Sequence, residues 1–233
     1  MERWKNCQIS QTHLSKQFSV VLYNVRGLLS RLPEVQDLVD TNCPSVCALV
    51  ETGDISSSLS GQWFPGYHRF FTPGSNSHGG VLVLVHNSIT YAVKYSEVNL
   101  IALTIPLGLC TLSVIACYSP PDSTLPTDTL KFLLDGSPTL LLGDFNAKSI
   151  DWNCTHNNAR GRVLQNIIEE CELHVGFVDR PTSKRSKNVI DLIITSFPSP
   201  EVSVLSYGTS DHWPVLFTSP WFTSSSFSFK EVR

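Results

Sequence analysis

One stretch of the chain reads Leu140-Leu141-Leu142-Gly143-Asp144-Phe145-Asn146-Ala147. The leucines predict a buried strand, and Gly143 is expected to let the backbone turn tightly at its end. Past that turn, Asp144 and Asn146 should project to one side, because side chains two residues apart share a face while the chain stays extended. A carboxylate can orient or deprotonate a water and an amide can donate to a phosphoryl oxygen, so the pair suits phosphate chemistry. The alternative is an ordinary strand that ends in an Asx turn.

Length and composition describe a folded globular protein. The chain has 233 residues and is 42% hydrophobic, which fits one large domain or two small ones. Its net charge of −3 excludes general attraction to polyanions, so nucleic-acid binding would need a local basic patch. Residues 1–17 form a polar leader without the apolar centre of a secretory signal, and no apolar run approaches the roughly 20 residues that cross a bilayer. We therefore expect a soluble intracellular protein with no membrane partner.

The hydrophobic pattern predicts a mixed α/β chain. Residues 18–50 read as strand, helix and strand, and residues 67–117 read as a meander of short strands. A second helix is expected from about 127 to 134, before the leucine strand. Asn158 is expected to cap an amphipathic helix whose apolar face includes Val163, Leu164 and Ile167. No linker divides residues 18–218, and the Ser- and Phe-rich residues 219–233 have no packed pattern.

Polar residues recur where the predicted strands end. Asn24 and Glu51 follow the first two strands, and ligand-binding groups in α/β folds gather at such ends. Asp191 lies inside the apolar run 188–195, where an unpaired carboxylate is too costly to bury, and the segment Ser210-Asp211-His212 offers it a partner. Each residue also has a structural interpretation: a solvated loop carboxylate for Glu51, a plain hydrogen bond for the Asp–His pair.

Taken in order, these segments resemble the endonuclease/exonuclease/phosphatase superfamily, which has the DNase I-like fold, and most of all the apurinic-type endonuclease domain of non-LTR (LINE-type) retrotransposons. The resemblance covers residues 18–218. The segments that carry it are Tyr23-Asn24-Val25-Arg26-Gly27, Val50-Glu51-Thr52, Gly79-Gly80-Val81, Tyr118-Ser119-Pro120-Pro121, Gly143-Asp144-Phe145-Asn146-Ala147, Asn158-Ala159-Arg160-Gly161-Arg162, Val189-Ile190-Asp191-Leu192 and Ser210-Asp211-His212-Trp213-Pro214. It implies a four-layer α/β/β/α sandwich with one divalent-metal site at one edge.

The resemblance also implies roles for individual residues. Glu51 matches the metal carboxylate, with Asn24 and Asp211 beside it, and Mg²⁺ is the expected ion with Mn²⁺ as a second candidate. Asp144 matches the residue that orients or deprotonates the attacking water, and Asn146 the amide that steadies the phosphate. His212 matches an imidazole that contacts the scissile phosphate, and Asp191 matches the carboxylate that orients this imidazole. Tyr118 matches a hydroxyl that contacts the phosphate, and Ser210 matches a serine that positions the backbone. The histidine and cysteine spacing fits no zinc motif.

Substrate contacts are expected from the loop that precedes the Asp191 strand. Thr182 matches a DNA-contacting threonine, and Lys184, Arg185 and Lys187 would grip phosphates. The loop is short, and Ser183 stands where the family often has an aromatic residue; both departures bear on the choice of target sequence.

The function implied is a Mg²⁺-dependent endonuclease that nicks double-stranded DNA and leaves a 3′-hydroxyl for target-site cleavage in retrotransposition. The implied setting is the nucleus, with a reverse transcriptase downstream in a longer polyprotein. Alternatives within the superfamily are an abasic-site repair endonuclease or a phosphatase, although the Trp-Thr-Asp-Arg-type loop of inositol phosphatases is absent. An alternative of a different class is a catalytically inactive nucleic-acid-binding module.

Overall fold

The computed structural model describes residues 17–59, 63–107, 110–198 and 200–219. The polar leader expected over 1–17 and the tail expected over 219–233 lie outside the described residues, apart from their innermost positions. At one of these, Ser219, the side chain is buried and the backbone N–H donates to the Phe18 carbonyl at 2.9 Å.

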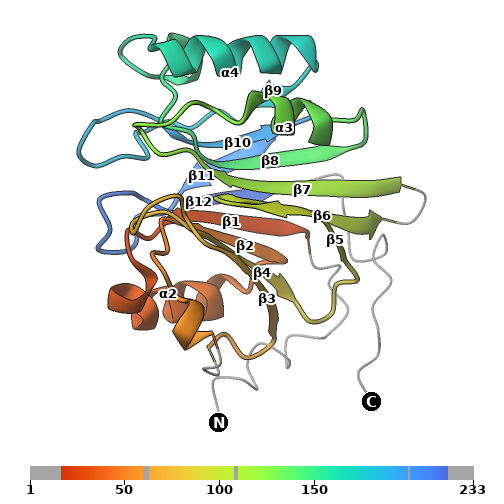
Figure 1. The fold of residues 1–233 in the computed structure, drawn as a ribbon, viewed down its shortest axis with the longest axis vertical. Coiled ribbons are helices and arrows are strands. Elements are labelled where there is room, and N and C mark those ends of the chain that lie inside the picture. Colours follow the sequence, from red (N-terminus) through yellow and green to blue (C-terminus); the bar gives the residue numbers. More distant parts are fainter. Residues whose placement is uncertain (1–16, 60–62, 108–109, 199, 220–233) are drawn as a thin grey trace.

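Two six-stranded sheets form the centre of the molecule (Figure 1). The first sheet has the order β11 (Glu201–Val204), β12 (Val215–Thr218), β1 (Ser19–Asn24), β2 (Val46–Val50), β4 (Val81–His86) and β3 (Tyr67–Thr72). The second has the order β5 (Ala92–Glu97), β6 (Leu100–Leu107), β7 (Cys110–Tyr118), β8 (Thr139–Asp144), β10 (Asp191–Thr195) and β9 (His174–Val175). In each sheet a single parallel pair, β1–β2 or β7–β8, is flanked by antiparallel strands.

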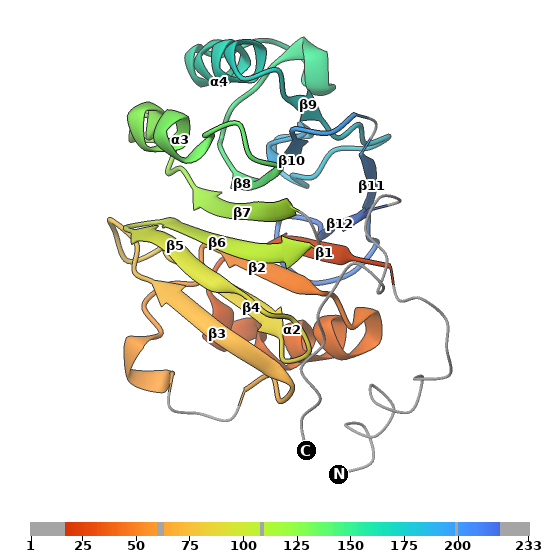
Figure 2. The same ribbon diagram turned by 90° about the vertical axis from the view of Figure 1, so that its right-hand side faces the viewer.

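Helices cover the outer faces of both sheets. They are α2 (Leu28–Asn42), α3 (Thr127–Leu133) and α4 (Ala159–Glu170), with short 3-10 turns at Ser56–Ser58 and Ile150–Trp152. Figures 1 and 2 place α2 outside the first sheet and α3 and α4 outside the second. The order helix, sheet, sheet, helix confirms the predicted α/β/β/α sandwich.

Successive side chains along each strand point to opposite faces of the sheet, so each strand contributes both to the core between the sheets and to the core under the helices. In β8, Leu140 and Leu142 face the other sheet while Leu141 faces the outer helices, and all three are fully buried. In β1, Leu22 and Tyr23 divide in the same way between the inter-sheet core and α2. Because both faces of these strands are buried, their sequences are continuous runs of apolar residues. None of the helices among the described residues is long and apolar enough to span a membrane.

Gly143 does not make the tight turn that the sequence led us to expect. It lies within β8, paired with Cys117 of β7 on one side and Leu192 of β10 on the other. A Cβ atom at this position would lie 1.8 Å from the Cys117 carbonyl oxygen. Glycine is therefore required by the close approach of two strands, and the strand continues to Asp144.

The N-cap and the buried face of helix α4 are as predicted, except at Val163. The Asn158 side chain caps it by accepting the Gly161 N–H at 2.7 Å, and Leu164 and Ile167 are buried against the second sheet. Val163, which we placed on the apolar face, is 40% exposed because it lies at the edge of the buried stripe.

Candidate active site at the strand ends

The polar residues predicted at strand ends meet where the two sheets face each other. Asn24 is the last residue of β1 in one sheet, and Asp144 is the last of β8 in the other. The Asn24 Nδ2 donates to Asp144 Oδ2 at 2.9 Å, and both residues are buried. This hydrogen bond joins the sheets at the edge that the site occupies.

A compact group of two carboxylates and an imidazole surrounds this contact. Asp191 is the register partner of Asp144 in the antiparallel β8–β10 pair. The His212 Nδ1 lies 2.7 Å from Asp191 Oδ2 and 4.0 Å from Asp144 Oδ2. The three side chains offer ligand atoms within 4.8 Å of one another, and all are buried. The structure thus gives Asp191 the His212 partner that its burial requires.

The shared burial changes the proton affinity of this group. Burial, followed by the negative charge of Asp191, raises the pKa of Asp144 to about 7. Burial alone would lower the pKa of His212, but the Asp191 carboxylate, with help from Asp144, raises it to about 10. At neutral pH the imidazole is therefore a cation held against Asp191.

Asn146 reaches the site by a different geometry from the predicted one. Its φ is +48°, so the chain turns at this residue and does not stay extended. Its N–H donates to Asp144 Oδ1 at 2.9 Å, which is the Asx turn that we had held as the alternative. Its Nδ2 donates to the Ser119 carbonyl at 3.1 Å. The amide is fixed beside Asp144 by the turn and by β7.

Glu51 and Tyr118 complete the candidate site from opposite sheets. Glu51 follows β2 with φ +54°, a strained conformation for a residue with a side chain, and Tyr118 ends β7. The Tyr118 hydroxyl faces the Glu51 carboxylate. Burial and this carboxylate both raise the pKa of Tyr118 above its usual range, and Glu51 also acts on Asp144. Glu51, like His212, therefore lies within electrostatic range of Asp144.

Asp211 lies among cations next to His212. Its Oδ2 forms ion pairs with Arg26 and, at 3.5 Å, with Arg185. Its Oδ1 is buried without a hydrogen-bond partner, as is Asp191 Oδ1, among the residues that the structure describes. Buried carboxylate oxygens of this kind are the hard donors that Mg²⁺ and Mn²⁺ take, and so are the Glu51 carboxylate and the side-chain carbonyl oxygen of Asn24. This donor chemistry suits a divalent cation, and among the described residues the carboxylate and imidazole atoms that lie within 4.8 Å of one another are those of Asp144, Asp191 and His212.

The basic loop differs from the expected row of free cations. Lys184 Nζ donates to the carbonyls of Gly208 and Ser210 at 2.8 and 2.6 Å and lies 3.6 Å from the centre of the Trp213 ring. Arg185 and Lys187 are exposed. Lys184 therefore ties the loop to the 208–213 segment, and the outward-facing charges of the loop are Arg185 and Lys187.

Thr182 is not brought to the surface. It is fully buried, and its Oγ1 accepts the N–H groups of Ile190 and Asp191 at 3.0 and 3.1 Å. This arrangement leaves no exposed hydroxyl to contact DNA, contrary to the sequence-based expectation. Thr182 instead fixes the backbone at Asp191.

Ser210 and Glu34 hold the histidine segment in place. Ser210 Oγ donates to the Asn24 carbonyl at 2.7 Å. Glu34 of α2 accepts from the Tyr23 hydroxyl at 2.7 Å and from the N–H and Oγ1 of Thr209 at 2.9 and 2.7 Å. Sequence reasoning missed Glu34, because nothing in a helical glutamate indicates a partner 175 residues away.

The charges around Glu34 decide its protonation. Burial would raise the pKa of Glu34, but the hydrogen bonds from Tyr23 and Thr209, with the positive charge of Arg31, lower it overall. Lys184 also faces this carboxylate, and Asp37 lies close by, because both Asp37 Oδ2 and the Glu34 carbonyl accept the Tyr207 hydroxyl. The carboxylate form of Glu34 is thus the form that holds the 207–210 turn.

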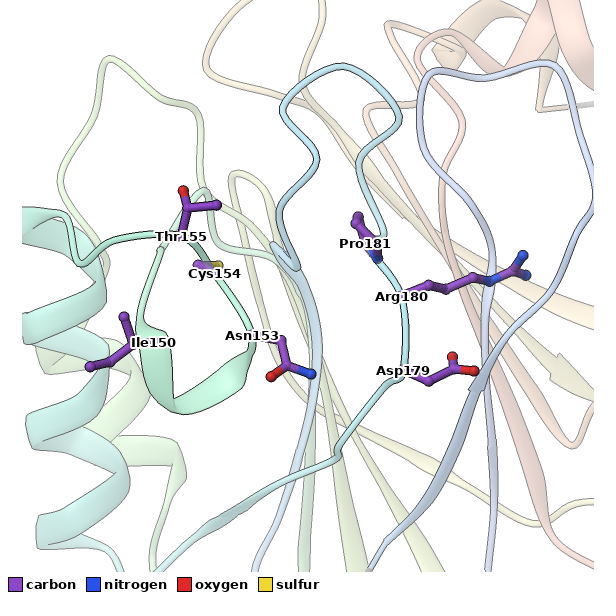
Figure 3. Close-up of a pocket in the computed structure, with 7 residues that line it drawn as sticks. All are labelled: Ile150, Asn153, Cys154, Thr155, Asp179, Arg180 and Pro181. Atoms are coloured by element: carbon purple, nitrogen blue, oxygen red, sulfur yellow. The ribbon is translucent and has the colours of Figure 1, made fainter.

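A surface pocket of about 330 Å³ lies beside the basic loop (Figure 3). Its lining residues are Ile150, Asn153, Cys154, Thr155, Asp179, Arg180 and Pro181. None of them belongs to the Asp144–Asp191–His212 group, and the Arg180 side chain extends away from Asn153 in Figure 3. The pocket does not contain the candidate site.

Parts of the chain are similar to known proteins. A family model described as "Endonuclease-reverse transcriptase" matches residues 112–216. A relative in Drosophila melanogaster, "Probable RNA-directed DNA polymerase from transposon X-element", is 28% identical over 216 residues, which cover 85% of this chain and 24% of that protein. The chain therefore spans about a quarter of the length of this curated relative.

Solved structures share the fold. The endonuclease domain of TRAS1, a telomere-specific non-LTR retrotransposon, superposes with a TM-score of 0.69 at 17% identity, covering 87% of this chain and 98% of that one. The AP endonuclease LMAP from Leishmania major gives a TM-score of 0.67 at 11% identity, covering 87% of each chain. A family model of endonucleases thus matches residues 112–216, and the whole sandwich shares its fold with endonuclease structures, one of them from a non-LTR retrotransposon.

Proposed function

We propose that the chain is a divalent-metal-dependent endonuclease that nicks double-stranded DNA and leaves a 3′-hydroxyl. The observation that carries the proposal is the convergence of Asp144, Asn146, Asp191 and His212 at one edge, with Glu51 and Tyr118 close to Asp144. These groups come from five separate segments of the chain. A structural hydrogen bond would need two of them, whereas hydrolysis of a phosphodiester needs the set.

Each side chain has a role in this proposal. Asp144 orients a water and takes its proton as the water oxygen attacks phosphorus, the bond from phosphorus to the 3′ oxygen breaks, and the released 3′ oxygen takes a proton from solvent water to become the 3′-hydroxyl. The His212 cation, oriented by Asp191, contacts the scissile phosphate and stabilises its added negative charge. Asn146 retains one amide proton beyond its bond to Ser119 and donates it to a phosphoryl oxygen. The Tyr118 hydroxyl contacts the same phosphate.

Glu51 would hold the metal ion, with Asn24 and Asp211 beside it. Mg²⁺, or Mn²⁺ in its place, supplies positive charge that stabilises the oxygens of the reacting phosphate. The protein's own part is to keep Glu51 and Asn24 at neighbouring strand ends, where the β1–β2 pairing holds Asn24 beside Val50.

DNA would lie across the exposed side of the basic loop. Arg185 and Lys187, which are exposed, would contact phosphates, while Thr182, Lys184 and Ser210 keep the loop and the histidine segment in register. Phosphate contacts by exposed cations position a duplex without reading its sequence.

The setting that fits this activity is target-site cleavage by a retrotransposon. The matched relatives are named as RNA-directed DNA polymerases, and this chain corresponds to about a quarter of their length. The 3′-hydroxyl would then prime a reverse transcriptase that forms another part of the same polyprotein, in the nucleus where the target DNA lies.

A nicking assay on supercoiled plasmid tests the proposal. The wild-type chain with Mg²⁺ or Mn²⁺ should convert plasmid to open circles, chelation by EDTA should stop the reaction, and Asp144→Ala and His212→Ala should each lower the rate by at least about a hundredfold. An intact plasmid with wild type, or undiminished nicking by both variants, rules the proposal out. Faster cleavage of an abasic-site duplex than of an intact one would assign the chain to repair instead.

A further inference from the structure

The segment Asn158-Ala159-Arg160-Gly161 lies against the candidate site but has no role in the chemistry described so far. Asn158 Oδ1 accepts the N–H of Lys148 at 3.0 Å and of Gly161 at 2.7 Å, and its Nδ2 donates to the Asn146 carbonyl at 3.0 Å. A Cβ atom at Gly161 would lie 1.8 Å from the Lys148 carbonyl oxygen. The first turn of α4 is therefore packed directly onto the chain that follows Asn146.

Arg160 extends this contact to the end of β7. One terminal nitrogen of its guanidinium donates to the Pro120 carbonyl and the other to the Ser119 hydroxyl. Ser119 is also the residue whose carbonyl accepts Asn146 Nδ2, and its own N–H donates to the Asp144 carbonyl at 2.9 Å. The turn held by Arg160 is thus the turn that contacts Asn146 and Asp144 and that follows Tyr118.

These contacts hold Asn146 in its backbone conformation. A side-chain-bearing residue with φ near +48° is in a sparsely populated conformation, which persists only where surrounding contacts over-determine it. Three contacts do so here: Asp144 Oδ1 accepts its N–H, Asn158 donates to its carbonyl, and Ser119 accepts its side-chain amide. The last of these depends on where the 119–121 turn lies.

We propose that Arg160 is a positioning residue for the hydrolytic site: by holding the Ser119–Pro120 turn against α4, it fixes the Asn146 amide and the Tyr118 hydroxyl around the phosphate. This inference rests on the proposed nuclease function. Each terminal nitrogen of Arg160 donates one hydrogen bond within the protein and the side chain is half-buried, which favours action through the turn over a direct contact with DNA.

A positioning role for Arg160 and a direct contact with a DNA phosphate predict different kinetic effects. A phosphate contact would change DNA affinity and its dependence on salt, whereas a displaced Asn146 amide lowers the rate of the bound complex. The same helix supplies a matched control in Arg162, which is exposed two residues away. Ser119→Ala removes one of the two acceptors while leaving the guanidinium in place.

The test compares Arg160→Gln, Arg160→Lys, Ser119→Ala and Arg162→Gln under single-turnover and steady-state nicking. We expect Arg160→Gln to lower kcat about 10- to 100-fold with KM for DNA changed less than about threefold, and Arg160→Lys to recover part of the loss by making one of the two contacts. Ser119→Ala combined with Arg160→Gln should cost less than the product of the separate losses, because both act on one turn. Arg162→Gln should match wild type.

Two outcomes overturn the inference while leaving the nuclease function intact. One is an Arg160→Gln enzyme that matches the Arg162→Gln enzyme in kcat. The other is a KM effect accompanied by a salt slope shallower by about one unit, which marks a lost phosphate contact. If wild type does not nick DNA, the proposed function fails, and hydrogen exchange then decides: faster exchange of the Ser119 and Asn146 amides in Arg160→Gln than in Arg162→Gln supports the positioning role, and equal rates refute it.

Discussion

Replacing Gly143 by alanine should damage both stability and activity, and the structure gives the size of the effect. The added Cβ would lie 1.8 Å from the Cys117 carbonyl oxygen, whereas real Cβ atoms essentially never come within 3.0 Å, so β7 and β8 must separate by about 1.2 Å. Overpacking and a weakened ladder together predict a loss of about 2 to 5 kcal/mol in the free energy of unfolding. The next register pair is Tyr118 with Asp144, so the same displacement reaches the candidate site.

Urea unfolding and plasmid nicking measure the two effects. A displacement of about 1 Å at reacting groups can cost about a hundredfold in rate, and we expect that loss in Gly143→Ala molecules that remain folded. Gly136→Ala is the control, because Gly136 has φ +85° but no atom within 4 Å of an added Cβ. It should lose only about 1 kcal/mol, from backbone strain, and keep full activity. A Gly143→Ala variant as stable and as active as Gly136→Ala would refute the close-approach argument.

Two further substitutions test the groups that support the site. Glu34→Gln should lower the free energy of unfolding by about 1 kcal/mol near neutral pH, after allowance for solvent screening. Because the folded-state pKa of Glu34 is below its usual value of 4.5, its contribution is full above that pH and fades as pH falls through the folded pKa. The stability difference between variant and wild type should therefore vanish in acid, and a constant difference would show that the Glu34 carboxylate does not hold the 207–210 turn. Thr182→Val leaves two buried backbone N–H groups without an acceptor and should cost about 2 to 4 kcal/mol in urea unfolding, while Thr182→Ser should cost less than about 1; equal losses in the two variants would show that the hydroxyl is not the stabilising group.

Local patterns predicted the strands and the polar residues at their ends, and the resemblance to the endonuclease/exonuclease/phosphatase superfamily implied the layers and the grouping of the site. Runs such as 140–142 are apolar on both faces, and polar residues at their ends mark an edge of the sandwich. The partner of Asp191 could be anticipated because a buried carboxylate restricts the choices, and the structure pairs it with His212 at 2.7 Å.

What the sequence could not reveal depends on contacts between distant segments. The need for glycine at 143 comes from Cys117, the left-handed turn at Asn146 is held by Ser119 and Asn158, and the inward orientation of Lys184 follows from the Gly208 and Ser210 carbonyls. None of these partners is adjacent in the chain. From the sequence, all the basic residues of the loop were therefore expected to bind phosphates, although Lys184 instead forms hydrogen bonds within the protein.

The central claim is that segments far apart in the chain converge on one metal-bound phosphate. A crystal of the wild-type chain with Mn²⁺ and a duplex carrying a non-hydrolysable phosphorothioate linkage tests it most directly. The account predicts an anomalous scattering peak at the Glu51 carboxylate and a backbone phosphate within hydrogen-bond distance of both His212 and Asn146. An ion bound away from Glu51, or a duplex whose phosphates do not reach His212, would contradict it.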